Sequence, residues 1–196
     1  MNIKNSYILV HTVDTDSIPA AVGIGFCTED NNTNEKAVYG IIIMNEHFVN
    51  NQFPFEDWEF IVFHECSHIV NYHSVATIPI NLPEVNATMV NLIDKMPLPL
   101  MILEGIKALY IRLFGEKRID PQLMRLHEIE ADAYAVRHTR NLLAAVNCFY
   151  RLSGGDMQGA SHKFELFGDK YPAITWSERI AELRKSLGPG QLRSPS

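Results

Sequence analysis

The sequence predicts an α+β fold in which a small N-terminal antiparallel β-sheet precedes a mainly helical remainder. Two observations lead to this prediction. The first third of the chain holds three segments rich in β-branched and aromatic residues. After Pro54 the apolar residues recur at helical spacing instead. A chain of 196 residues suffices for one compact domain, so we expect a single domain over residues 1–186 and a disordered tail over 187–196.

The predicted strands cover residues 7–13, 20–27 and 37–45. The stretch TEDNNTNE separates the second strand from the third, and its composition is typical of a turn. We therefore expect these two strands to form a hairpin. The apolar run YGIIIMN in the third strand is a candidate for pairing with an extended substrate peptide by edge-strand addition.

The first predicted helix runs from Phe55 to about residue 72, where apolar side chains share one face: Trp58, Ile61, Val62, Cys66, Ile69 and Val70. Further helices are predicted over residues 84–95, 98–114, 121–140, 141–152 and 175–187. The segment 98–114 is the most apolar of these, but it contains charged residues and is shorter than the roughly 20 apolar residues that span a bilayer. We interpret it as a buried helix, with a helix on a membrane surface as the alternative.

Composition excludes some classes of protein and compartment. The formal net charge is −6 and no clustered basic face is visible, which argues against nucleic acid as a partner. The three cysteines Cys27, Cys66 and Cys148 are widely spaced and odd in number, so we expect no disulfide framework and a reducing compartment. The N-terminus has no apolar run of signal-peptide length. These features together predict a cytoplasmic protein.

The stretch HECSH, residues 64–68, carries the chemistry that the sequence suggests most directly. Residues four apart lie on one face of a helix, so His64 and His68 can direct imidazole nitrogens at one zinc ion, at about 2.0–2.1 Å. Glu65 is rotated by about 100° around the helix. It therefore lies beside the metal, where a general base for a water molecule belongs. The alternative is a buried helix whose histidines belong to the core.

A catalytic zinc also needs a third protein ligand and an open position. In LHEIEADAYA, residues 126–135, Glu128 and Asp132 are four apart and share a face of a helix made slim by alanines. One acid would bind the metal, and the other would accept a hydrogen bond from a ligand histidine and so fix its tautomer. A solvated acidic face is the alternative.

Three neighbouring residues are weaker candidates. His127 is a rival third ligand, but it points about 100° away from Glu128. His73 lies about 140° around the helix from His68, so we expect it to cap the helix end or to pair with a neighbour. Cys66 turns away from the metal face and is interpreted as a core residue.

The stretch HECSHIVNYH resembles the signature of the gluzincin metallopeptidases that include the CAAX prenyl protease and HtpX-type enzymes. In that signature a further histidine follows HExxH by five residues, as His73 does here. A later helix carries ExEAD, which the residues Glu128, Glu130, Ala131 and Asp132 match. Near the end, Arg179 and Ile180 match an Arg-Ile pair that begins a terminal helix, whereas Tyr171 stands where the family has a histidine.

The resemblance implies a zincin-like zinc endopeptidase with His64, His68 and Glu128 as metal ligands and Glu65 as the general base. It also implies that Asp132 supports a ligand histidine. Cys66-Ser67 departs from the family's aliphatic-glycine pair, and no flanking membrane helices are present, so a prenylated substrate is not implied. A tyrosine hydroxyl at position 171 can donate to an oxyanion, as the family's histidine would.

The sequence thus leaves three functional hypotheses. The first is a zinc peptidase that acts on a peptide or protein substrate. The second is a zinc-stabilised binding or regulatory protein without turnover. The third is a peripheral membrane factor that uses residues 98–114. Glu65 favours the enzyme, because a structural zinc site takes a fourth ligand and has no use for a base.

Overall fold

The structure, a computed structural model, describes residues 2–3, 7–13, 21–30, 35–46, 53–71, 73, 121–159, 161, 165–166, 169–170 and 174–187. The chain divides into two compact units, and each is described separately. Unit 1 comprises Met1–His47 and His68–Ile119, and unit 2 comprises Phe48–Ser67 and Asp120–Ser196. The division falls inside one continuous helix. The interpretation of residues 1–186 as a single domain stays a prediction.

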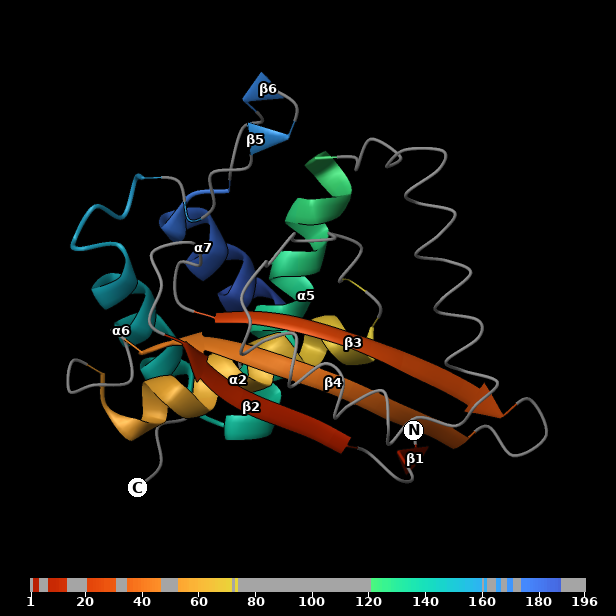
Figure 1. The fold of residues 1–196 in the computed structure, drawn as a ribbon. Coiled ribbons are helices and arrows are strands. Elements are labelled where there is room, and N and C mark those ends of the chain that lie inside the picture. Colours follow the sequence, from red (N-terminus) through yellow and green to blue (C-terminus); the bar gives the residue numbers. More distant parts are fainter. Residues whose placement is uncertain are drawn as a thin grey trace. The chain divides into compact units, whose positions relative to one another are not determined.

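Unit 1 contains a mixed β-sheet with β4 (Glu35–Asn45) at its centre, between β2 and β3 in Figure 1. β3 (Ala21–Asp30) pairs with β4 in antiparallel orientation over its full length, which confirms the predicted pairing of these strands. β2 (Tyr7–Val13) and the short β1 (Asn2–Ile3) pair with β4 in parallel orientation.

The prediction of a purely antiparallel sheet was therefore wrong. The sequence predicted the hairpin of β3 and β4 but gave no evidence on how β2 pairs. β4 contains the most continuous apolar run, and its neighbours Ile42 and Ile43, which point to opposite faces of the sheet, are both fully buried. A strand that is buried on both faces belongs at the centre of a sheet. β4 accordingly lies between β2 and β3, and β2 pairs with it in parallel orientation.

The same pairing overturns the expectation that YGIIIMN offers an edge for a substrate peptide. Residues 39–44 of β4 pair with β2 on one side and with β3 on the other. Their backbone donors and acceptors are already used in the two ladders. Edge-strand addition at this segment is thus excluded.

The described residues are mostly helical, and four helices match predicted segments within a few residues. They are α2 (Phe55–Val70), α5 (Pro121–Thr139), α6 (Leu142–Leu152) and α7 (Trp176–Leu187), labelled as in Figure 1. A short hairpin joins β5 (Glu165–Leu166) to β6 (Asp169–Lys170). Helices and strands in separate stretches of chain agree with the coarse α+β class.

Several predicted segments lie outside the described residues. They are the helices over 84–95 and 98–114 and the tail beyond Leu187, which is itself the last, buried residue of α7. Within the part of the chain that the structure describes, no helix combines the length and apolar character needed to cross a membrane.

Unit 2 is a helical assembly in which α5 contacts both α6 and α7. Its buried centre includes Phe149 of α6, whose ring lies edge-on to Phe60 of α2 with centroids 5.3 Å apart. On α5 the alanines at 131, 133 and 135 are buried. Their small side chains leave room for neighbouring helices to approach α5 closely, and the predicted close packing against α2 stays a prediction.

A sharp break separates α5 from α6. Arg140 adopts a left-handed conformation with φ of 55°, and its N–H donates to the carbonyl of Val136 at 2.8 Å, which closes α5. Asn141 then caps α6 by accepting a hydrogen bond from the backbone N–H of Ala144 at 3.0 Å. The chain therefore changes from one helix to the next within two residues.

Candidate metal centre

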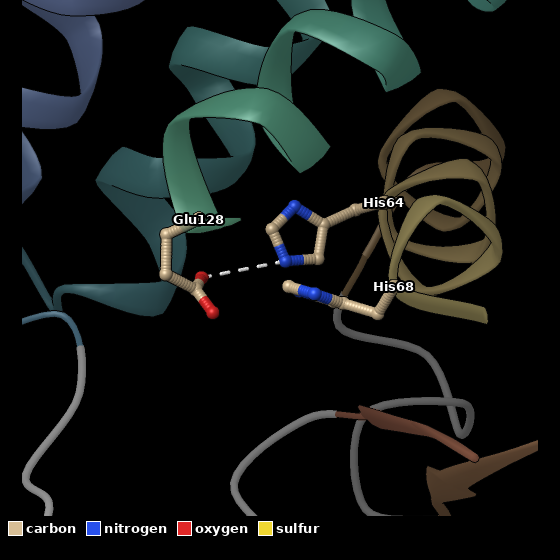
Figure 2. Close-up of side chains that lie close together, drawn as sticks. All are labelled: His64, His68 and Glu128. Atoms are coloured by element: carbon tan, nitrogen blue, oxygen red, sulfur yellow. Dashed lines mark ion pairs between the residues drawn. The ribbon is translucent and has the colours of Figure 1, made fainter. Parts of the chain in front are cut away.

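Two helices bring three metal-ligating side chains together. His64 and His68 project from the same face of α2 toward Glu128 on α5 (Figure 2). One ligand atom from each residue lies within 4.8 Å of the other two. His64 and Glu128 are each 7% exposed, and His68 is half-buried. This group could hold a metal ion.

The distance between His64 and Glu128 fits a metal of the size of zinc. Two ligand atoms that bind one tetrahedral zinc at about 2.0–2.1 Å lie roughly 3.3 Å from each other. Nε2 of His64 lies 3.4 Å from Oε2 of Glu128, which is close to that separation. Two imidazoles and a carboxylate are common zinc ligands, but imidazole also suits copper, iron and nickel. The three side chains could therefore hold a metal ion, and their chemistry does not fix which metal.

Asp132 determines which nitrogen of His64 faces the other ligands. Its carboxylate is fully buried, and Oδ1 lies 2.9 Å from Nδ1 of His64. An ionised carboxylate can only accept hydrogen bonds, so Nδ1 carries the proton in this contact. In the neutral ring, Nε2 is then left with a lone pair that faces Glu128. The two acids that the sequence places one turn apart on α5 thus make different contacts with one histidine.

Arg179 of α7 completes this network. Its Nε donates to Oδ2 of Asp132 at 2.8 Å and its Nη2 donates to Oδ1 at 2.6 Å. The same Nη2 lies 3.5 Å from Oε2 of Glu128. The guanidinium is 4% exposed and packs against the rings of Phe149 and Trp176, at 4.6 and 5.4 Å from their centroids. One arginine therefore contacts both acids of the site.

Arg179 matches a motif in the sequence, but the motif alone gave no role for it. A signal was nevertheless present in α7. The buried residues of this helix are Trp176, Arg179, Leu183 and Leu187, spaced by three or four positions. An arginine within such an apolar stripe indicates a buried anionic partner, because arginine is almost never fully buried unless it is paired. The sequence could not identify that partner, because Asp132 lies 47 positions away.

A capping box fixes the residue at which α7 begins and thereby the position of Arg179 in its first turn. The N–H of Glu178 donates to the hydroxyl of Thr175 at 3.1 Å, and the N–H of Thr175 donates back to the Glu178 carboxylate at 2.8 Å. Glu178 also accepts a hydrogen bond from Arg125 of α5 at 3.2 Å. These contacts tie the first turn of α7 to the helix that carries Glu128 and Asp132.

The buried charges in this network stabilise one another. Burial lowers the pKa of His64, but its hydrogen bonds to Asp132 and Glu128 and their charges outweigh this effect and raise the pKa to about 10. Burial raises the pKa of Asp132, but the charge and hydrogen bonds of Arg179, together with those of His64, lower it below its usual value. Asp132 is therefore ionised, and without a metal His64 is protonated at neutral pH.

Glu65 and His127, two further predicted site residues, are each adjacent in sequence to a member of this group. Glu65 is half-buried on α2, between the two histidines in sequence and outside the group of three. His127 lies beside Glu128 on α5 and is also outside this group, and burial lowers its pKa. Tyr171 lies outside the described residues.

His73 follows the C-terminus of α2. Its backbone N–H donates to the carbonyl of His68 at 2.9 Å, and the two rings meet edge-on with centroids 5.3 Å apart. This residue thus caps the helix end and pairs with a neighbour, as the sequence predicted. Cys66 is half-buried, and burial raises the pKa of its thiol to about 11. Cys66 and Cys148 are both free thiols.

Comparisons of the chain with protein-family models, with curated proteins and with solved structures found no match.

Proposed function

We propose that this chain is a zinc-dependent endopeptidase with a zincin-like fold, which acts on peptide or protein substrates in the cytoplasm. The observation that supports the proposal most is the arrangement around His64. Its Nε2 lies 3.4 Å from the Glu128 carboxylate while its Nδ1 lies 2.9 Å from Asp132. Catalytic zinc sites combine three protein ligands with such a carboxylate–histidine contact. His68 supplies the third ligand.

In the proposed mechanism each residue has a separate task. A bound zinc would polarise the scissile carbonyl and lower the pKa of a water molecule towards about 7. Glu65 would accept the proton of the attacking water and deliver it to the leaving nitrogen. Asp132 would keep the proton on Nδ1 of His64, so that Nε2 stays available as a ligand. Tyr171 is the proposed donor to the developing oxyanion.

The alternative is a zinc-stabilised binding or regulatory protein without turnover. One observation favours it. The ring of His73 lies 5.3 Å from that of His68, so a third imidazole, which would be a fourth ligand, stands next to a proposed ligand. Structural zinc sites use four protein ligands and leave no open position. A fourth ligand supplied by His73 would convert a catalytic site into a structural one.

The deciding experiment replaces Glu65 by Gln, which preserves the shape of the side chain but cannot accept a proton at neutral pH. Glu59→Gln is the matched control, because Glu59 is another half-buried glutamate of α2. Each protein is loaded with one equivalent of zinc and incubated with an unstructured peptide mixture. We expect unchanged zinc content in both variants and a 10²–10⁴-fold loss of cleavage in Glu65→Gln alone, which is the usual contribution of a general base.

Two results would contradict the peptidase proposal. If the parent binds zinc but cleaves nothing, the binding or regulatory protein becomes the better interpretation. If Glu65→Gln cleaves as fast as Glu59→Gln, then Glu65 is not the general base, and the proposed mechanism loses its proton acceptor.

A further inference from the structure

Arg179 contacts both acids of the candidate metal centre. Its guanidinium bonds to both oxygens of Asp132, and the same Nη2 approaches the Glu128 carboxylate at 3.5 Å. Asp132 Oδ1 is shared, because it accepts from Arg179 at 2.6 Å and lies 2.9 Å from Nδ1 of His64. A continuous chain of contacts therefore runs from Arg179 through Asp132 to a ligand histidine.

The geometry of this chain restricts the carboxylate of Asp132. Two parallel hydrogen bonds from a planar guanidinium fix the plane of the carboxylate as well as its position. Once that plane is fixed, Oδ1 points at Nδ1 of His64 and orients the imidazole ring. The guanidinium is itself held by the rings of Phe149 and Trp176. The rings thus orient Arg179, Arg179 orients Asp132, and Asp132 orients His64.

We propose that Arg179 is a positioning residue of the metal site, which acts through Asp132 to hold His64 in the orientation and tautomer that bind a metal ion. This inference rests on the proposed function, because it assumes that His64 is a ligand. Arg179 would set the affinity of the site without touching the metal or the substrate. A lysine at this position would keep the charge but lose the bidentate contact.

A second arginine–aspartate pair in the same unit provides the control. Arg151 of α6 makes two hydrogen bonds to the buried Asp57 of α2, through Nε and Nη2. The replacement of Arg151 by Lys therefore removes the same kind of contact at a place with no ligand histidine. If Arg179 only links helices, as Arg151 does, both lysine variants should bind zinc as tightly as the parent, whatever their loss of stability.

The experiment measures zinc affinity by competition with a chromogenic chelator in Arg179→Lys, Asp132→Asn, the double variant and Arg151→Lys. We expect Arg179→Lys to bind zinc 10–100-fold more weakly, which is the usual cost of losing such a supporting contact. Arg151→Lys should bind zinc as the parent does. The double variant should bind no more weakly than Asp132→Asn alone, because Arg179 acts through Asp132.

The outcomes separate this inference from the proposed function. A parent that does not bind zinc overturns both. If the parent binds zinc and Arg179→Lys binds it with the same affinity, only the role of Arg179 is overturned. Additive losses in the double variant also overturn it, because Arg179 would then act independently of Asp132. If the parent binds zinc and the variants show the expected affinities, but the parent cleaves no peptide, the role of Arg179 is supported and the peptidase proposal is overturned.

A measurement on the parent covers the case in which Arg179→Lys does not fold. The ¹⁵N resonances of the arginine Nε–H groups are followed during a zinc titration. Arg179 should shift in proportion to bound zinc, because it contacts Asp132 and lies 3.5 Å from Glu128. Arg151 serves as the internal control and should not shift. If both resonances stay in place while zinc binds, the proposed coupling is absent.

Discussion

The two buried aspartates of unit 2 form similar contacts in different surroundings. Asp57, in the first turn of α2, accepts two hydrogen bonds from Arg151 of α6. Asp132, in the middle of α5, accepts two hydrogen bonds from Arg179 of α7. Both aspartate side chains are 1% exposed. Each pair therefore joins two helices through a buried carboxylate.

The partners of these aspartates differ. The Arg151 side chain is 34% exposed, whereas that of Arg179 is 4% exposed. A partly exposed pair is screened by water and contributes little to stability, while a buried pair must offset a large cost of desolvation. Asp132 also contacts His64, and the described contacts of Asp57 include no histidine. The Asp132 pair thus retains a buried charge beside His64, a candidate metal ligand, and the Asp57 pair acts as a link between helices.

The largest effect that follows from this difference is a pH dependence of zinc binding. Without metal, Asp132 and Glu128 raise the pKa of His64 to about 10, above its ordinary value of 6.5. Protonated His64 therefore stabilises the metal-free fold fully below pH 6.5, and this contribution is lost as the pH rises through about 10. Because zinc must displace this proton from the folded protein, the His64 contribution should raise zinc affinity about tenfold per pH unit as the pH approaches about 10 from below.

Calorimetry in buffers of different ionisation enthalpy measures the proton count directly. We expect at least one proton to be released per zinc bound near neutral pH, because His64 must lose its proton to bind the metal. Zinc binding to Asp132→Asn should release fewer protons than zinc binding to the parent, because the substitution removes one of the two charges that raise the pKa of His64. Release of no proton by the parent would contradict the placement of His64 in the metal site.

The next effect compares the two aspartates by the same substitution. Asp132→Asn removes the charge of the carboxylate that binds the buried Arg179, and the loss of such a charge typically lowers stability by about 3–5 kcal/mol. It should also weaken zinc binding 10–100-fold. Asp57→Asn leaves an arginine that can reach water, so its loss of stability should be smaller, and zinc binding should not change. Thermal unfolding and chelator competition measure the two quantities. Equal zinc affinity in both variants would remove the distinction between the pairs.

Local patterns in the sequence predicted much of this site. The spacing of His64 and His68 and that of Glu128 and Asp132 are both helical repeats, and helices did form over both segments. Spacing along one helix cannot show that Asp132 contacts Nδ1 while Glu128 faces Nε2, because that depends on how α2 and α5 pack. The role of Arg179 depends in the same way on the packing of α7 against α5.

The sheet shows the same limit. Residues 7–13 were predicted as a strand with the bounds that β2 has, because β-branched residues report local conformation. The position of β4 between β2 and β3 depends on pairing between distant segments. Ile42 and Ile43 are buried on opposite faces of the sheet. In the sequence they form only part of a continuous apolar run, which by itself does not distinguish a central strand from other buried elements.

The smallest effect concerns the helix caps that precede the two arginines. Thr175 caps α7 four residues before Arg179, and Asn141 caps α6 ten residues before Arg151. Replacement of either by Ala should cost about 1 kcal/mol of stability, measured by urea unfolding. Thr175→Ala loosens the turn that positions Arg179, so it should also weaken zinc binding several-fold, whereas Asn141→Ala should not. If both caps lower stability equally and neither changes zinc affinity, the first turn of α7 is not what places Arg179 against Asp132.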